Sequence, residues 1–377
     1  MNSAAIRAQS DDSPACAFVA FEPIRDWAHT VHILKMWDAF MCSGVDTTLL
    51  MYPDGDEVPS ASDLQTRYAL SNTPRISWIP RNDNRAIRAL RVLFESFRAG
   101  RKRAYAYTTR ALPALGALLG GTQDVFLEFH QIMDARSDRL AYRLGRHSKR
   151  LHTICISQQL SEIVAQEFGF DSSGIIVEHS GHSFPIHDDY DAASSAGRPL
   201  RAMYVGTLLP GKGVETIFDL ARRLPNVDFV IVGGTEPTQA LPQNVTTVAS
   251  VPHASVPELM GQADILLLPY TKDAMPSSGK GFFSPLKMVE YLSAGRSIVS
   301  SRLPSISEVL VHESNCLLVE PESTEEWSAA LERLERDPAL RERLAHAAAE
   351  TAASHTNLER VRRIFGHAGH GRHPAGT

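Results

Sequence analysis

The feature that most constrains the fold is an alternation of short apolar runs with segments of helical spacing along all 377 residues. Strands that alternate with helices form parallel sheets with helices on both faces. A chain of this length can bury two separate cores. The sequence therefore predicts an α/β protein with two Rossmann-like, doubly wound domains.

The predicted elements of the first half are short strands separated by helices. The strands are expected at 15–21, 46–51, 76–79, 105–108, 124–129, 153–157 and 175–178, and the helices at 30–42, 85–97, 112–119, 134–147 and 158–167. In the second half we expect strands at 200–205, 228–232, 245–248, 264–268, 297–300 and 316–319, and helices at 214–224, 256–262, 285–294, 305–311, 327–334, 338–353 and 358–365. Residues 52–73 are expected to form a polar loop or a small excursion.

The predicted domain organisation follows from a change in composition at 188–199, which is rich in Asp, Ala, Ser and Gly and is expected to be a linker. Residues 1–187 then form the first domain and 200–355 the second. A C-terminal helix over 356–365 can cross back to the first domain. The tail, 366–377, is rich in Gly, His and Pro and is expected to be disordered.

Composition excludes several classes. The net charge of −5 argues against a surface built to bind nucleic acid. The four cysteines form no CxxC pair, which argues against zinc or a disulfide framework and favours a reducing compartment. The polar start is unlike a signal peptide, and the apolar runs are too short for a membrane span. We therefore expect a cytoplasmic location.

Three strand ends in the second half are suited to an anion. Residues 206–213 read Gly-Thr-Leu-Leu-Pro-Gly-Lys-Gly between a strand and a helix, and Lys212 can meet a phosphate, although the Walker A pattern fails. Gly233-Gly234 lets a ligand approach the backbone. Ser284 and Pro285 are predicted to cap and start a helix behind a Gly- and Ser-rich loop, so its N-terminus can hold phosphate and Glu290 can reach hydroxyls. The alternative is an ordinary capped helix with a solvated Glu290.

Histidines follow two predicted strands of the first half. In a parallel sheet, ligands bind at the carboxyl ends of the strands, where His130 follows Glu128 and where His179 lies. A lone histidine is more often a structural hydrogen-bonding group, so this interpretation stays open for both. The loop 22–30 lacks a G-x-G-x-x-G pattern, which disfavours a nicotinamide cofactor.

Two segments of the first half are strongly basic. Residues 85–103 hold seven Arg or Lys against one Glu, and residues 136–150 hold six against one Asp. Such helices can contact an anionic membrane or an anionic acceptor, or they can simply be solvated faces.

Taken together, the motifs of the second half resemble those of the retaining GT-B glycosyltransferases of family four (glycosyl transferases group 1), in particular a Ser-Pro-Leu-Lys subgroup. The matching segments cover most of residues 200–365 in order: Tyr204-Val205-Gly206, Lys212-Gly213, 229–234, 256–260, 263–270, Ser284-Pro285-Leu286-Lys287, Glu290, Ala294-Gly295 and 317–319. In the first half the match is thinner and consists of 128–130, 156–157 and 179–181.

The resemblance implies a GT-B fold, in which two Rossmann-like domains face each other across a cleft and the first domain takes the acceptor. The donor would be a nucleotide-diphosphate sugar. The diphosphate of the donor would be held by Gly206, Thr207, Lys212 and the backbone of Leu286 and Lys287. Glu290 would bind the ribose, and the base would lie near Val251. The sugar would meet His130 and the main chain around Phe283 and Ser284, and Gly233 and Pro285 would complete the site. The acceptor would be a glycan, a lipid-linked molecule or a small molecule. The family usually needs no metal, so no metal or cofactor is expected, and transfer would be front-face with retention.

Two departures from the family pattern concern the donor. The family has a Glu-x7-Glu pair, but Phe282 stands where the first glutamate belongs. Thr207 stands where an arginine commonly follows the glycine, and Lys280 or Lys287 could supply the missing charge. Two alternatives therefore stay open: a non-catalytic protein that binds nucleotide sugar or glycan, and a sugar-nucleotide epimerase that would need Glu128 as an acid or base.

Overall fold

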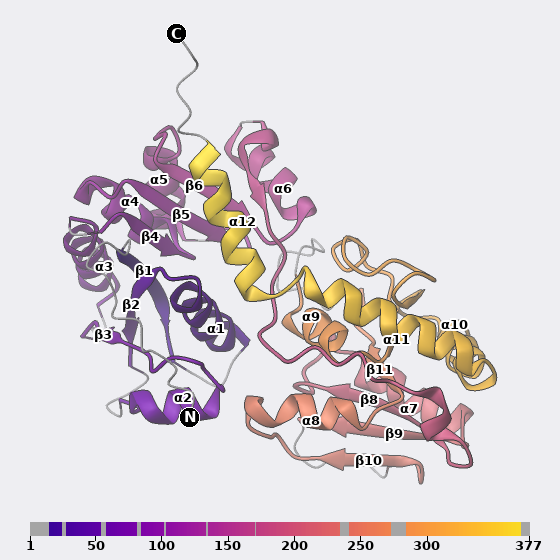
Figure 1. The fold of residues 1–377 in the computed structure, drawn as a ribbon. Coiled ribbons are helices and arrows are strands. Elements are labelled where there is room, and N and C mark those ends of the chain that lie inside the picture. Colours follow the sequence, from indigo (N-terminus) through magenta and orange to yellow (C-terminus); the bar gives the residue numbers. More distant parts are fainter. Residues whose placement is uncertain are drawn as a thin grey trace.

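Two parallel sheets, each covered by helices on both faces, form the molecule (Figure 1). The computed structural model describes residues 15–24, 28–53, 58–80, 84–101, 103–132, 135–169, 171–233, 241–272 and 284–370. The predicted fold class, an α/β protein with two doubly wound domains, is confirmed.

The first sheet has seven strands in the order β3-β2-β1-β4-β5-β6-β7, with all described pairs parallel. They are β1 (Ala15–Pro23), β2 (Asp46–Tyr52), β3 (Ile76–Trp78), β4 (Tyr105–Thr108), β5 (Asp124–Phe129), β6 (Leu151–Cys155) and β7 (Ile176–Val177). Its helices are α1 (Ala28–Cys42), α2 (Ala61–Arg67), α3 (Arg85–Gly100), α4 (Ala111–Gly120), α5 (Arg136–Gly145) and α6 (Gln158–Phe168).

Alternation along the strands separates two cores in this domain. Successive side chains of a strand point to opposite faces. Phe18 of β1 therefore packs with Trp37 of α1, while Val19 packs with Val92 of α3 on the other face. Helices α4, α5 and α6 enclose a further cluster next to that of α3.

The second sheet has six strands in the order β10-β9-β8-β11-β12-β13, again parallel. They are β8 (Leu200–Val205), β9 (Val227–Val232), β10 (Val245–Val248), β11 (Ile265–Leu268), β12 (Ser297–Ser301) and β13 (Leu317–Val319). Its helices are α7 (Val214–Arg223), α8 (Val256–Gly261), α9 (Leu286–Ser293), α10 (Thr324–Arg336) and α11 (Pro338–Ala353).

Helix α12 (Asn357–His370) follows α11 and lies against α1 in the first domain (Figure 1). A buried arginine on α12, Arg360, donates to the carbonyl oxygens of His179 and Glu178 at 2.7 and 3.1 Å. Helix α12 therefore returns the chain to the first domain.

The bounds of several elements are shifted by a few residues, and three differences from the predicted elements are larger. Helix α2 lies inside the segment expected to be a loop, where Ser60 caps it by accepting from the backbone of Asp63. Residues 305–311, expected to be helical, form turns. Helix α12 continues to His370, so residues 366–370 are helical and not disordered, whereas the rest of the tail lies outside the described residues.

Candidate functional site

A pocket of about 390 Å³ lies between the two domains, at the carboxyl ends of β5, β8 and β11. The first domain lines it with His29, Val31, His32, His130 and Ser180. The second domain lines it with Val205, Gly206, Thr207, Lys212, His253, Val256, Tyr270, Ser284, Pro285, Leu286, Lys287 and Glu290. The structure therefore brings together His130, Lys212 and Glu290, the three residues expected to be catalytic, which lie far apart in the sequence.

A second cavity adjoins this pocket and contains the remaining predicted donor residues. Gly233 and Val251 line it, and it shares Gly206, Thr207 and His253 with the first pocket. Arg67 and Tyr68, at the end of α2, close it from the first domain. Phe283 and Phe282 lie outside the described residues, as does Lys280.

The start of α9 differs from the prediction. Pro285, not Ser284, is the N-cap residue, and no side chain caps the helix. The Ser284 hydroxyl instead accepts from the backbone of Ser180 at 3.0 Å, and the Ser180 hydroxyl donates to the carbonyl of Ser284 at 3.1 Å. Ser284 thus joins the first domain to α9, and the first amides of the helix, which have no intrahelical acceptor, lie at the pocket.

Two lysines converge on this helix start. Lys287 donates to the Tyr204 hydroxyl at 2.9 Å, and its Nζ lies 4.2 Å from the centre of the Tyr204 ring and 5.4 Å from that of Tyr270. The Nζ of Lys212 lies 4.6 Å from the centre of the Tyr270 ring. Desolvation, and then the charge of Lys212, lower the pKa of Lys287 to about 7. Desolvation also lowers the pKa of Lys212.

Glu290 contacts His253, a residue that was not among the predicted site residues. His253 Nε2 lies 2.7 Å from Glu290 Oε1, and both residues line the pocket. His253 follows Val251 by two residues, so its place behind the predicted base-binding segment was the available signal. The pair fixes the direction of the carboxylate expected to meet a ribose.

Three histidines gather on the first-domain side. The ring of His130 lies 4.6 Å from that of His32 and 5.8 Å from that of His29. Desolvation lowers the pKa of His29 to about 3 and that of His32 to about 4, so both rings are neutral at pH 7. His29 and His32 occupy the first turns of α1, after the first strand, and this position was the signal that could have identified them.

Beneath these rings, Glu128 is fully buried in an ion pair with Arg360, whose Nη2 lies 2.5 Å from its Oε1. His130 and His32 approach its two oxygens at 3.2 and 3.3 Å, and Tyr107 donates to it. Burial raises the pKa of this carboxyl, but Arg360 and the histidines hold it well below its usual range. An ionised carboxylate that does not line the pocket is poorly suited to the acid or base role of an epimerase.

His32, Glu128 and His130 are also residue types that can bind a metal ion. One ligand atom each from His32, Glu128 and His130 lie within 4.8 Å of one another. An ion held there would share the Glu128 carboxylate with Arg360. A positive neighbour at this distance opposes cation binding.

His179, the other predicted strand-end histidine, does not line either pocket. Its Nε2 lies 3.5 Å from Glu308 in the second domain. Glu308 also accepts from the backbone amides of Gln158 and Gln159 at the start of α6. The histidine therefore belongs to a contact between the domains.

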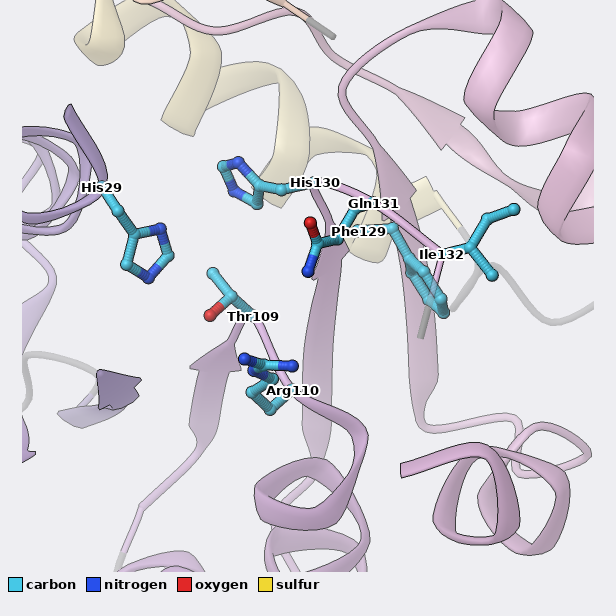
Figure 2. Close-up of a pocket in the computed structure, with 7 residues that line it drawn as sticks. All are labelled: His29, Thr109, Arg110, Phe129, His130, Gln131 and Ile132. Carbon is cyan, nitrogen blue, oxygen red and sulfur yellow. The ribbon is translucent and has the colours of Figure 1, made fainter. Parts of the chain in front are cut away.

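A smaller cavity of about 240 Å³ opens beside the histidines (Figure 2). Its lining comes from α1, from the loop after β4 and from the end of β5 (Figure 2): His29, Thr109, Arg110, Phe129, His130, Gln131 and Ile132. His130 lines this cavity and the interdomain pocket, so its ring stands where the two meet.

Comparison with solved structures gives whole-chain similarity. Alr3699/HepE of Anabaena, solved in complex with UDP, superimposes with a TM-score of 0.72 at 15% identity and covers 94% of this chain and 100% of that one. The sucrose-phosphate synthase of Thermosynechococcus elongatus gives a TM-score of 0.67 at 14% identity, covering 95% and 98%. The chain has the GT-B fold.

Sequence comparison matches less than half of the chain. The family model described as glycosyl transferases group 1 matches residues 189–351. The alpha-D-kanosaminyltransferase of Streptomyces kanamyceticus is 26% identical over 174 residues, which is 43% of this chain and 42% of that protein. The match thus spans about two fifths of this curated relative. The segment matched by the family model includes every predicted donor residue from Gly206 to Glu290.

Proposed function

We propose that the protein is a glycosyltransferase that moves a sugar from a nucleotide-diphosphate sugar to an acceptor with retention of configuration. The observation that carries the proposal is the interdomain pocket, where the uncapped start of α9, Lys212 and Glu290 face His130 across the cleft. Backbone amides at a helix start and a nearby ammonium bind phosphate, and a fixed carboxylate binds sugar hydroxyls.

The matching family model and the fold support the same activity. HepE of Anabaena was solved with UDP and with UDP-glucose, and its fold extends over this whole chain. A donor of that chemical class would place its base in the cavity of Gly233 and Val251 and its diphosphate between Lys212 and α9.

The proposed retention is supported by the groups that the pocket offers to a reacting sugar. Among its described lining residues Glu290 is the only carboxylate, and His253 holds it on the donor side. A covalent intermediate on a carboxylate therefore has no supporting residue here. Departure of the diphosphate, stabilised by the lysines and the helix amides, would let the acceptor attack from the same face. The neutral rings of His29 and His32, beside His130, would contact the sugar.

Two alternatives have different signatures. A non-catalytic binding protein would bind a nucleotide sugar without releasing nucleoside diphosphate. An epimerase would change the sugar without an acceptor, and the buried ion pair of Glu128 with Arg360 weighs against it.

A thermal-shift panel with UDP, GDP, ADP, dTDP and CDP tests the donor site. A ligand at 100 times its dissociation constant adds about 2.7 kcal/mol to the free energy of unfolding. We expect one nucleotide to stabilise the wild type and to lose its effect in Lys212→Ala and in Glu290→Ala. No shift with any nucleotide would refute the donor site, and a product with inverted anomeric configuration would refute retention.

We also propose a peripheral contact with anionic membrane, on the cytoplasmic side. The adjacent helices α3, α4 and α5 each expose apolar side chains by more than half: Leu90, Phe94, Leu119, Leu140 and Leu144. Exposed arginines on the same helices, among them Arg98 and Arg143, match an anionic surface. No helix in the described part of the chain is long and apolar enough to cross a bilayer.

Flotation with vesicles of phosphatidylcholine alone or mixed with phosphatidylserine tests this contact. We expect binding only with the anionic lipid, and loss of binding in Leu90→Asp/Leu144→Asp. Val311→Asp is a matched control, because Val311 is an exposed apolar residue of the second domain. Equal flotation by the wild type and the double variant would contradict the contact.

A further inference from the structure

We infer that Lys287 supplies, together with Lys212, a two-lysine clamp for the diphosphate of the donor, so that the cation missing at Thr207 comes from α9. The inference rests on the proposed function and adds to it a specific side chain and a proton linkage. It selects Lys287 from the two lysines, Lys280 and Lys287, that the sequence offered to supply the missing charge, and it concerns the ammonium group as well as the backbone.

Position is the first argument. Lys287 Nζ lies against the glycine that precedes Thr207, because a Cβ added to Gly206 would be 2.4 Å from this nitrogen. The side chain of Lys287, on α9, thus occupies the space beside the loop 206–213. Gly206 has a φ of +147°, a backbone conformation that favours glycine.

The second argument is the absence of a direct ion pair at either lysine, although the charge of Glu290 acts on Lys287 and opposes the fall in its pKa. In the described part of the chain, neither Lys212 nor Lys287 forms an ion pair with a carboxylate. Both ammonium groups lie over tyrosine rings, and Lys287 also donates to a hydroxyl. Partly buried cations that face each other are unfavourable unless an anion joins them. The site is therefore suited to an anionic ligand.

A proton linkage follows from the same geometry. The charged and titratable groups around Lys287 are Lys212, Glu290, Tyr204 and Tyr270, with His32, His29 and His130 across the pocket. With its pKa near 7, Lys287 is partly neutral in the free protein at pH 7.5. A bound diphosphate favours the ammonium and raises this pKa, so binding takes up a proton. Affinity is then highest below pH 7 and falls as the pH rises above it.

The test compares a nucleoside diphosphate with its monophosphate by titration calorimetry. The probe is UDP, or whichever of the five diphosphates stabilises the wild type, with the matching monophosphate. Lys287→Met keeps the length of the side chain and removes its charge. Lys272→Met is the control, since Lys272 is an exposed lysine whose nearest partner is Glu322 at 4.0 Å.

We expect Lys287→Met to weaken diphosphate binding about 10- to 100-fold, the usual effect of one charged hydrogen bond. The affinity for the monophosphate should fall by a smaller factor. In the variant, the decline in diphosphate affinity between about pH 7 and 8.5 should be shallower than in the wild type. An unchanged melting temperature without ligand shows that the variant folds.

Two results would overturn the clamp. Equal loss for diphosphate and monophosphate, or unchanged affinity and pH dependence, would show that Lys287 does not act on the diphosphate. Both results require that the wild type binds, so they leave the proposed function standing. Failure of the wild type to bind any of the five diphosphates would refute the clamp and the donor site together.

Discussion

The fully buried pair of Glu128 and Arg360 gives the sharpest stability prediction. Both side chains are 0% exposed, and they join β5 to α12 across 232 residues of sequence. Removing one partner of such a pair leaves an uncompensated charge, which costs about 3–5 kcal/mol. Arg360→Met should therefore lower the free energy of unfolding by about that amount at pH 7, and Glu128→Gln should do likewise.

The double variant measures the coupling between the two charges. In Glu128→Gln/Arg360→Met neither charge remains, so we expect the loss to be smaller than the sum of the single losses by at least about 2 kcal/mol. Urea unfolding of all four proteins gives these values. A double variant as unstable as the sum of the two single variants would refute the electrostatic reasoning and leave only lost packing.

The pH dependence of Arg360→Met provides an independent check. In the wild type the pKa of Glu128 is held below its value in the unfolded chain. The stability that Glu128 contributes is therefore fully present above the unfolded pKa and is lost as the pH falls through the folded pKa. Without Arg360, burial raises the folded pKa, and folding then takes up a proton. The destabilisation should shrink between pH 7 and 5.5, and an equal loss at both values would contradict the assignment.

Two smaller predictions concern the donor loops. Gly213→Ala should lower the melting temperature by several degrees, because the φ of Gly213 is +75° and the new Cβ would lie 1.6 Å from the carbonyl oxygen of Pro269. Gly121→Ala is the control: the φ of Gly121 is +90° but the space around it is open, so this variant measures the backbone strain without the steric clash. His253→Ala should weaken nucleotide binding by about tenfold without unfolding the protein, because Glu290 loses a charged hydrogen bond at 2.7 Å. Melting curves and calorimetry check these, and unchanged affinity in the second variant would show that Glu290 needs no support.

Most of the fold could be predicted because its signals are local. The strands 105–108, 124–129, 200–205 and 245–248 were predicted with their observed bounds, since each is a short apolar run between turn signals. Helix α2 was missed although Ser60 and Asp63 carry its capping signal, because seven residues give too short a periodic pattern. The end of α12 was misplaced because Gly366 and Gly369 read as helix breakers.

The site was harder to predict where its contacts link distant segments. Lys212 and Glu290 belong to strand-turn-helix patterns and could be identified locally. The role of Ser284 could not, because a serine before a proline reads as a cap and its actual partner, Ser180, lies 104 residues away. Arg360 could not be identified either, because its partner Glu128 lies 232 residues away. Its arginine-rich surroundings on α12 also resemble a solvated helix face.

The two sides of the pocket differ in charge, and this difference orients any donor that binds there. The second domain presents Lys212, Lys287 and the amides of α9, all of which favour an anion. The first domain presents neutral rings, with His29 and His32 uncharged at pH 7. We therefore expect a diphosphate to be held on the second domain, with the uncharged sugar directed toward His130. Because His29 and His130 both line the smaller cavity as well as the interdomain pocket, we expect an acceptor that enters through that cavity to meet the sugar beside these two histidines.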